Sequence, residues 1–177
     1  MPIEHEARVR IRPGTVADVP AMQALGTRTW RVTYCGVLSP EAIDSGIAEF
    51  CNAYSLGTAA RSGRILVAER DGAIAGLLES DTMADGRPVV WKLYVALEAQ
   101  RGGIGRALLD AHLARLRGEG ATELWLEHYE GNVPAEAFSE RVGFVVRRVE
   151  ESAAGAGARI VWRSRSVSLG RLLHDPP

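Results

Sequence analysis

The chain has 177 residues, a formal net charge of −1 and 46% hydrophobic residues, which fits one soluble globular domain with a buried core. This balanced charge provides no basic face for nucleic acid, and no apolar run approaches the roughly 20 residues of a membrane span. The first residues, MPIEHEARVR, lack the apolar region of a signal peptide, and the two cysteines, Cys35 and Cys51, form neither a disulfide framework nor a metal motif. We therefore expect a cytoplasmic protein that has no metal, no nucleic-acid partner and no membrane partner.

The first third of the chain predicts a strand followed by helices. Ala7–Arg12 alternates apolar and basic residues, as a strand does. After Pro13-Gly14 a helix is expected over residues 15–34, with Thr15 or Asp18 as its N-cap. Ser39 and Pro40 open a second helix, and a third is expected between about residues 52 and 61.

The rest of the chain predicts strands, interrupted by one long helix and one short helix. Two strand-like runs, residues 64–70 and 73–80, are joined by Asp71-Gly72, a strong signal for a two-residue hairpin. Asp85-Gly86 marks the next turn, before a strand over Pro88–Val95. The later elements are a helix over 103–120 with the apolar face Ile104, Leu108, Leu109, Leu113 and Leu116, a strand over 122–129, a helix over 133–142, and a hairpin of strands 143–150 and 158–165.

The order of these elements predicts the fold class. An antiparallel meander is followed by one strand–helix–strand crossover, and a crossover makes its two strands parallel. We expect an α+β fold with a central, mostly antiparallel sheet of about seven strands, one parallel crossover and helices on both faces. Residues 1–163 are expected to form a single domain and residues 164–177 a loosely held tail.

A glycine-rich basic loop separates the strand that ends at Val95 from the long helix. A helix N-terminus attracts phosphate, and glycines allow both positive φ and close approach of the backbone to a ligand. Arginine suits phosphate oxygens. The loop therefore favours a diphosphate-bearing ligand over a plain helix-capping turn, through Gly102, Gly103, Gly105, Arg101 and Arg106.

The spacing within the loop discriminates between classes of ligand. A Walker loop requires a lysine that the loop lacks. The dinucleotide pattern G-x-G-x-x-G is met by Gly103 and Gly105, but Leu108 occupies its third position. Glu127 lies where a ribose-binding acid would fall, although too little chain precedes the loop for a doubly wound sheet. An NAD-dependent oxidoreductase remains an alternative on these grounds.

Two motifs in register resemble the GNAT superfamily of acetyl-CoA-dependent N-acetyltransferases. The family loop Q/R-x-x-G-x-G/A matches QRGGIG, residues 100–105. The family pattern N-x-x-A-x-x-F-Y-x-x-x-G-F resembles NVPAEAFSERVGF, residues 132–144. One crossover separates the two motifs, and the resemblance extends over nearly the whole chain apart from the tail.

The resemblance implies acetyl-CoA as cosubstrate and direct transfer of its acetyl group to a primary amine of a small molecule or a protein N-terminus. Pantetheine would bind main chain at the end of the strand that precedes the loop, like an added strand. A main-chain N–H there would polarise the thioester carbonyl. The cofactor-binding residues that the resemblance implies are Leu93, Tyr94, Val95, Gln100, Arg101, Gly102, Gly103, Ile104, Gly105, Arg106, Asn132 and Phe138.

Catalysis requires a base, because an alkyl amine is mostly protonated at neutral pH. Glu127 is the first candidate, since it lies five residues before Asn132, as in the family's ribosomal-protein acetyltransferases, and Glu79 is the second. The tyrosine that usually protonates the leaving thiolate is replaced by Ser139, and Tyr129 is a possible stand-in. This replacement motivates a second hypothesis, a non-catalytic acyl-CoA-binding module.

The acceptor side is expected on the first helices. Trp30 and Tyr34 share a helix face, either as a core pair or as a wall of the acceptor pocket with Tyr129. TWRVTYCGVL resembles the W-R-x-x-Y-x-G pattern of some small-molecule acetyltransferases. Cys35, which has no identifiable paired base, is expected to be a small buried cysteine. The closing hairpin offers an edge at which a homodimer can form.

Overall fold

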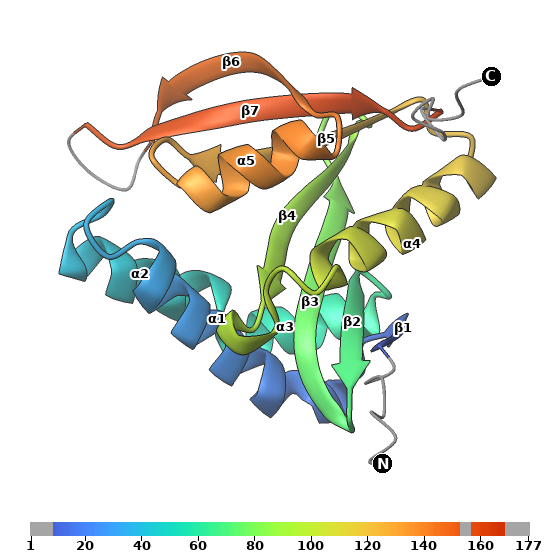
Figure 1. Ribbon diagram of the computed structural model, residues 1–177, viewed down its shortest axis with the longest axis horizontal. Helices are drawn as coiled ribbons and strands as arrows, with labels where there is room; N and C mark the ends of the chain where they lie inside the picture. Colours follow the sequence, from blue (N-terminus) through green and yellow to red (C-terminus); the bar gives the residue numbers. More distant parts are fainter. Residues whose placement is uncertain (1–8, 153–156, 169–177) are drawn as a thin grey trace, which may run out of the picture. The chain divides into compact units, whose positions relative to one another are not determined.

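The computed structural model describes residues 9–152 and 157–168 (Figure 1). Its helices are α1 (Val19–Thr33), α2 (Pro40–Phe50), α3 (Ala53–Arg61), α4 (Ile104–Gly118) and α5 (Val133–Arg141), with the short 3-10 helices η1 (Val16–Asp18) and η2 (Leu97–Ala99). Its strands are β1 (Val9–Pro13), β2 (Ile65–Arg70), β3 (Ala73–Thr82), β4 (Pro88–Val95), β5 (Glu123–Tyr129), β6 (Val145–Glu151) and β7 (Arg159–Ser166).

The strands are hydrogen-bonded in the order β1-β2-β3-β4-β5-β7-β6. β4 and β5 are parallel, as the crossover predicts, and the predicted α+β class with about seven strands is confirmed. The chain packs as two compact units. The N-terminal unit holds the described residues up to Ser80 together with Lys92–Asp110, and the C-terminal unit holds Asp81–Trp91 together with the described residues from Ala111 on.

The β2–β3 hairpin of the N-terminal unit forms at the predicted turn. Asp71 and Gly72 have φ values of 52° and 79°, and two successive positive φ angles define the turn that matches the twist of a hairpin. Ile65 pairs with Glu79 and Arg70 pairs with Ala73 across the antiparallel ladder. The turn sets the register next to it, and a bulge between Ala68 and Glu69 then shifts the pairing by one residue, so that Glu79 lies opposite Ile65.

An acidic cap starts the first helical segment. The Asp18 carboxylate accepts hydrogen bonds from the Thr15 main-chain N–H and hydroxyl at 2.8 and 2.9 Å, and it pairs with the Arg12 guanidinium at 2.8 Å. The Arg12 hydrogen bonds hold the pKa of Asp18 well below its usual value. The carboxylate thus stabilises the fold at neutral pH, and this contribution is lost as the pH falls through the lowered pKa. Both predicted caps are used, Thr15 for η1 and Asp18 for α1.

Opposite faces of β3 contact different helices within the N-terminal unit. A Cβ at Gly76 would lie 2.9 Å from Ile104 and 3.2 Å from Leu108, so only glycine allows α4 to approach this closely. Glu79 is three residues further along the strand and therefore points to the other face, where Lys92 meets both Glu79 and Phe50 of α2.

The C-terminal unit is built on an antiparallel three-strand arrangement. β5 pairs with β7 over its whole length, and β6 pairs with β7 on the other side. Val89 and Val90 of β4 pair in parallel with Trp125 and Leu126 of β5. A core cluster of this unit contains Val89, Trp125 and Trp162, with Met83 and Ile160 packed against it.

The end of β7 corrects the expected start of the tail at residue 164. The strand continues to Ser166, and Val167 is fully buried, with its N–H donating to the Thr122 carbonyl at 2.9 Å. The predicted strand 158–165 agrees with this end to within one residue, whereas the domain boundary at 163 was placed too early because the arginines of RSRS look like exposed residues. Arg163 donates to His128 and Arg165 donates to the Val142 carbonyl, so both guanidiniums are satisfied while buried. Residues 169–177, like the first residues of the predicted strand 7–12, lie outside the described residues.

The predicted apolar face of α4 is buried as expected, but a histidine shares it. Ile104, Leu108, Leu109, Leu113 and Leu116 are each at most 4% exposed. His112 is 2% exposed, and among the described residues neither of its ring nitrogens has a hydrogen-bond partner. Burial lowers the pKa of His112 from 6.5 to about 4, so the imidazole is neutral at pH 7.

His112 is expected to make the fold acid-sensitive between pH 6.5 and pH 4. The unfolded chain binds a proton at His112 in this range and the folded chain does not, so stability falls as the pH falls, by up to about 3 kcal/mol. His112→Leu should reduce this dependence and keep full stability at pH 7. Urea unfolding of both proteins at pH 7 and pH 5 measures it, and an equal acid sensitivity of the two would contradict the prediction.

Candidate active site

The glycine loop has a strained backbone that leads directly into α4. Arg101 and Gly103 have φ values of 63° and 77°, in the left-handed region that favours glycine. The Gly103 carbonyl accepts the first helical hydrogen bond, from Ala107 N–H at 2.9 Å. The Gln100 side-chain amide donates to the Val95 carbonyl at 3.3 Å and so links the loop to the end of β4.

The same loop presents the groups that a diphosphate requires. The first N–H groups of a helix have no partner within the helix and carry partial positive charge. Arg101, Gly102 and Gly103 are exposed around them. Arg106 is also exposed and pairs with Asp110, one turn further along α4, at 3.1 Å. These residues therefore offer the main-chain and charged groups that a diphosphate requires.

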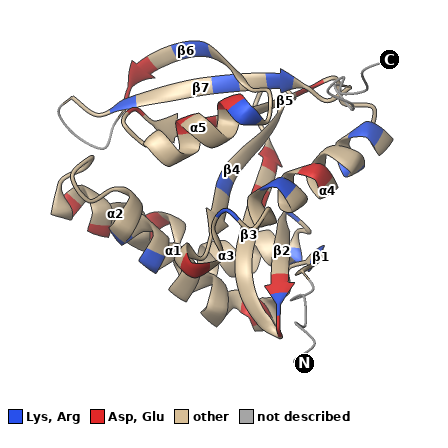
Figure 2. Cartoon of the chain, in the orientation of Figure 1, with Lys and Arg blue, Asp and Glu red and all other residues tan. Residues whose placement is uncertain are grey.

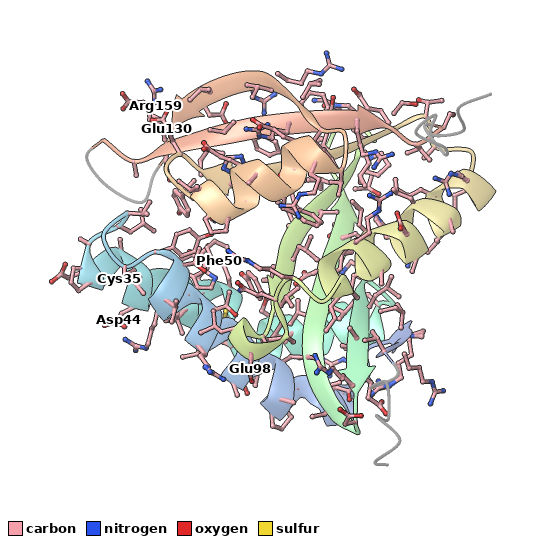
Figure 3. The ribbon with its side chains drawn as sticks, in the orientation of Figure 1. Cys35, Asp44, Phe50, Glu98, Glu130 and Arg159 are labelled. Carbon is pink, nitrogen blue, oxygen red and sulfur yellow. The ribbon has the colours of Figure 1, made fainter. Side chains whose placement is uncertain are left out.

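An aromatic cluster in the N-terminal unit contains two of the three residues predicted for the acceptor side, Trp30 and Tyr34. Trp30 is 4% exposed, and its indole N–H donates to the Tyr94 hydroxyl at 2.7 Å. The Tyr34 ring meets Trp30 edge-on at 4.6 Å, and Phe50 stacks on it at 5.8 Å. Trp30 is therefore a core residue, while Tyr34 is half-buried. Phe50, which is labelled in Figure 3, is 37% exposed, so Tyr34 and Phe50 offer aromatic surface.

Glu79, the second candidate base, is bound in a buried ion pair. Its carboxylate lies 2.5 Å from the ammonium of Lys92, and the two side chains are each 6% exposed. The Phe50 ring lies 6.0 Å from the same ammonium. The Glu79 carboxylate is thus committed to the Lys92 ammonium, and breaking a buried ion pair is costly. The pair therefore argues against Glu79 as the base.

The two cysteines are placed differently from the expectation. Cys35 is exposed, so the expectation of a small buried cysteine at this position was wrong. Cys51 is 3% exposed, and burial raises the pKa of its thiol to about 11. Its neutral sulfur occupies the place of a small apolar side chain, because a Cβ at Gly26 would lie only 2.7 Å from it.

The three strand residues predicted to contact pantetheine end β4. Leu93, Tyr94 and Val95 are half-buried, and the register that β4 shares with β5 consists of Val89 and Val90, before these residues. Burial raises the pKa of Tyr94 well above its ordinary value, so its hydroxyl stays protonated. The Tyr94 side chain therefore contacts Trp30. The groups that Leu93, Tyr94 and Val95 offer to a ligand are their main-chain N–H and C=O groups.

Glu127, the first candidate base, lies in the middle of the C-terminal unit. It is half-buried and faces Trp162 across the β5–β7 ladder. Burial raises the pKa of Glu127, the nearby carboxylate of Glu150 raises it further, and Arg148 opposes both. A carboxylate with a raised pKa is a better proton acceptor near neutral pH than an ordinary glutamate. The electrostatics of this position thus suit a general base.

The neighbouring His128 points to the other face of β5, as strand alternation predicts. Its Nε2 accepts a hydrogen bond from Arg163 at 3.0 Å, while Nδ1 lies 2.9 Å from the Tyr129 carbonyl. A ring that accepts at Nε2 donates from Nδ1 and is neutral. Burial lowers the pKa of His128 in agreement with this state.

The residues of the second motif have structural partners within α5. The Ser139 hydroxyl donates to the Ala135 carbonyl at 2.6 Å and is 2% exposed, which argues against a role as the proton donor. Asn132 is the N-cap of α5, where its side-chain oxygen accepts from the Ala135 N–H at 3.2 Å. Phe138 and Tyr129 are half-buried.

The predicted residues therefore fall into two groups. Trp30, Tyr34, Glu79, Leu93–Val95 and the loop residues 100–106 belong to the N-terminal unit, and Glu127, Tyr129, Asn132, Phe138 and Ser139 belong to the C-terminal unit. Sequence reasoning missed Lys92, Phe50 and Glu150. Only Lys92 carried a signal, since it is the single lysine of the chain. Among the described residues, no cluster of histidine, cysteine and acidic side chains is arranged to hold a metal ion, and no helix is long and apolar enough to cross a membrane.

The fold, the glycine loop and the helix capped by Asn132 define an acyl-CoA-dependent transferase of the GNAT type. The model of the acetyltransferase (GNAT) family matches residues 28–144, about two thirds of the chain. The chain belongs to this family and is an acetyltransferase by class. A search of curated proteins found no match.

Solved structures of acetyltransferases share the fold. A PaiA N-acetyltransferase from Thermoplasma acidophilum in complex with coenzyme A has a TM-score of 0.76 at 22% identity, over 89% of this chain and 99% of that one. The ribosomal-protein-S18-alanine N-acetyltransferase of Escherichia coli has a TM-score of 0.64 at 19% identity, over 93% and 97%. A nourseothricin acetyltransferase is 29% identical over 58% of this chain and 64% of its own, with a TM-score of 0.54.

Proposed function

We propose that this protein transfers the acetyl group of acetyl-CoA to a primary amine of a small molecule or a protein N-terminus, by direct attack of the amine. The observation that carries the proposal is the loop of residues 100–105, whose positive φ angles at Arg101 and Gly103 lead into the N-terminus of α4 in a chain of the GNAT family. The relative solved with coenzyme A supports the choice of cosubstrate.

The loop binds the diphosphate through main-chain N–H groups, with Arg101 and Arg106 supplying charge. Arg106 exchanges its surface partner Asp110 for phosphate oxygens, at small cost because both side chains are more than half exposed. Leu93–Val95 offer main-chain groups to pantetheine beyond the stretch of β4 paired with β5. When bound, acetyl-CoA supplies a thioester carbonyl that an amine can attack.

Glu127 accepts the proton of the attacking amine, directly or through a water molecule. Its raised pKa supports this role, and the ion pair of Glu79 with Lys92 disfavours the competing carboxylate. The leaving thiolate takes up a proton from water or from Tyr129, because Ser139 donates its hydroxyl proton to a carbonyl within α5. Tyr129 shares its strand face with Glu127, which supports Tyr129 as the alternative to water.

The acceptor binds against the exposed aromatic surface of Tyr34 and Phe50. Apolar rings beside a protonated amine favour binding through cation–π attraction. The relatives are named for a protein alanine and for nourseothricin, so both a peptide N-terminus and a small molecule stay in the proposal. The two cysteines are free thiols, which supports a reducing cytoplasm as the location.

A turnover assay tests the proposal against the non-catalytic acyl-CoA-binding module. Acetyl-CoA is incubated with a panel of small amines and short peptides, and the release of free thiol is followed. Thiol release that depends on the amine supports the transferase. Binding of coenzyme A without thiol release across the panel favours the module, and thermal stabilisation by NAD alone would revive the oxidoreductase.

Gly103→Ala is expected to weaken coenzyme A binding by at least about tenfold, because a side chain at φ 77° strains the loop and stands among the N–H groups that hold the diphosphate. Gly118→Ala is the matched control, since a Cβ there meets open space and its φ is ordinary. Titration calorimetry with coenzyme A compares the two variants. Unchanged affinity of the Gly103 variant would refute the role of the loop.

A further inference from the structure

The outer edge of β6 is an interaction surface that the proposed activity does not use. Of the described strands only β7 is hydrogen-bonded to β6, which therefore ends the sheet (Figure 1). Every residue of β6 is exposed. Val145, Val146 and Val149 are 51%, 50% and 43% exposed, although valine on a solvated edge invites pairing with another strand.

The hydrogen-bond pattern shows which main-chain groups this edge presents. Ser152 N–H donates to the Ala158 carbonyl, so these two residues form a hydrogen-bonded pair of the antiparallel ladder. Alternation along the strand makes Glu150 with Ile160 the next such pair and Arg148 with Trp162 the one after. The N–H and C=O groups of Val149 and Glu151 therefore point away from β7.

The charges of β6 complement a second copy of the same strand in a single register. In Figure 2 the ribbon of β6 changes from basic to acidic along its length, in the sequence VVRRVEE. A twofold axis at Val149 places the Val149 residues of the two copies opposite each other, with their outward-pointing N–H and C=O groups facing. The same axis places Arg148 of each copy opposite Glu150 of the other copy. A twofold axis at Arg148, at Glu150 or at Glu151 would place like charges opposite each other. An axis between two residues would place the outward-pointing main-chain groups of one copy opposite inward-pointing groups of the other.

The side chains of β6 are already oriented for this register. Arg148 lies over the Trp162 ring at 4.6 Å and 3.2 Å from Glu150 of its own strand. Glu150 accepts a hydrogen bond from the Trp162 indole at 2.6 Å. The Arg148 guanidinium and the Glu150 carboxylate thus lie on one face of the strand. In a pair of copies each of these groups would lie next to a group of opposite charge from the other copy. The bulge between Val146 and Arg148 confines regular pairing to residues 148–151.

We propose that two copies of this chain associate through antiparallel pairing of their β6 strands about a twofold axis at Val149. Such an interface is isologous, because the same residues contribute from both copies. An edge strand with charges of one sign only would repel a second copy, whereas β6 carries charges of both signs. The interface involves none of the residues assigned to coenzyme A or to the acceptor. Because Arg148 and Glu150 also act on the pKa of Glu127, the test reads the oligomeric state and not the activity.

A charge-swap experiment tests the register. Arg148→Glu and Glu150→Arg each create like charges across the axis and should weaken the dimer by at least about tenfold. An equal mixture of the two variants, and the double variant Arg148→Glu/Glu150→Arg, restore opposite charges and should dimerise. Arg141→Glu, an equal charge change at an exposed residue of α5, is the control and should leave the dimer intact.

Light scattering after size exclusion, over a concentration series, gives the mass of each species. We expect twice the chain mass of 19.1 kDa for the wild type, the mixture, the double variant and the control, and a shift toward one chain mass for each single variant. Circular dichroism checks that all variants are folded. A wild type that stays monomeric throughout, or single variants that dimerise as the wild type does, would overturn the proposal.

Discussion

Glu127→Gln is expected to lower kcat by about 10²- to 10⁴-fold, the range that general-base catalysis contributes in enzymes. Glutamine keeps the size and polarity of the side chain but cannot accept the amine proton. Because the base must be ionised, the activity of the wild type falls as the pH falls through the raised pKa of Glu127. The variant should lose this acidic limb and keep its affinity for coenzyme A.

Two further variants sharpen the assignment of the base. Glu150→Gln removes a negative charge that raises the pKa of Glu127, so the acidic limb should move to lower pH. Glu130→Gln is the matched control, since Glu130 is an exposed carboxylate just after the same strand, paired with Arg159 (Figure 3). A pH–rate profile of Glu127→Gln that keeps the acidic limb at full rate would show that another group is the base.

Lys92→Met is expected to lower the free energy of unfolding by about 3–5 kcal/mol, because it leaves the Glu79 carboxylate buried without its ammonium partner. This is a large part of the stability of a typical domain. The double variant Lys92→Met/Glu79→Leu removes both charges and should recover much of the loss. Urea unfolding of the two single variants and the double variant forms a double-mutant cycle that measures the coupling directly.

The ion pair of Arg106 with Asp110 provides the comparison for this cycle. Both of its side chains are more than half exposed, so Arg106→Met should cost less than about 1 kcal/mol. A cost for Lys92→Met as small as that for Arg106→Met would mean that water reaches the Glu79–Lys92 pair. In that case Glu79 would return as a candidate base.

The elements of the fold are predictable where the signals are local. Asp71-Gly72 and Ser39-Pro40 act through the dihedral angles of a few residues, and the hairpin and α2 form at these positions. The predicted strand 158–165 also matches β7 to within one residue at each end, but the burial of Arg163 and Arg165 is not predictable in this way, because arginines look like a solvated segment. Only the acceptors that the rest of the fold supplies allow their burial.

In the candidate site, too, the features that depend on local sequence are predictable and the features that depend on distant residues are not. Alternation along β5 correctly places Glu127 and His128 on opposite faces, since a strand has a period of two. Glu150, which raises the pKa of Glu127, comes from a strand more than 20 residues away, and no spacing rule brings the two together. Ser139 fits the motif by position, yet its hydroxyl contact to Ala135 depends on the helix it lies in.

The buried environment of Lys92 has a chemical consequence for an enzyme that handles an activated acetyl group. Lys92 is the single lysine of the chain, and its ε-ammonium is enclosed in a buried ion pair with Glu79. An ammonium has no lone pair with which to attack a thioester. The remaining cations of the side chains are arginines, whose guanidiniums stay protonated and are not nucleophilic. The described lysine and arginine side chains therefore offer no free amine to the acetyl donor.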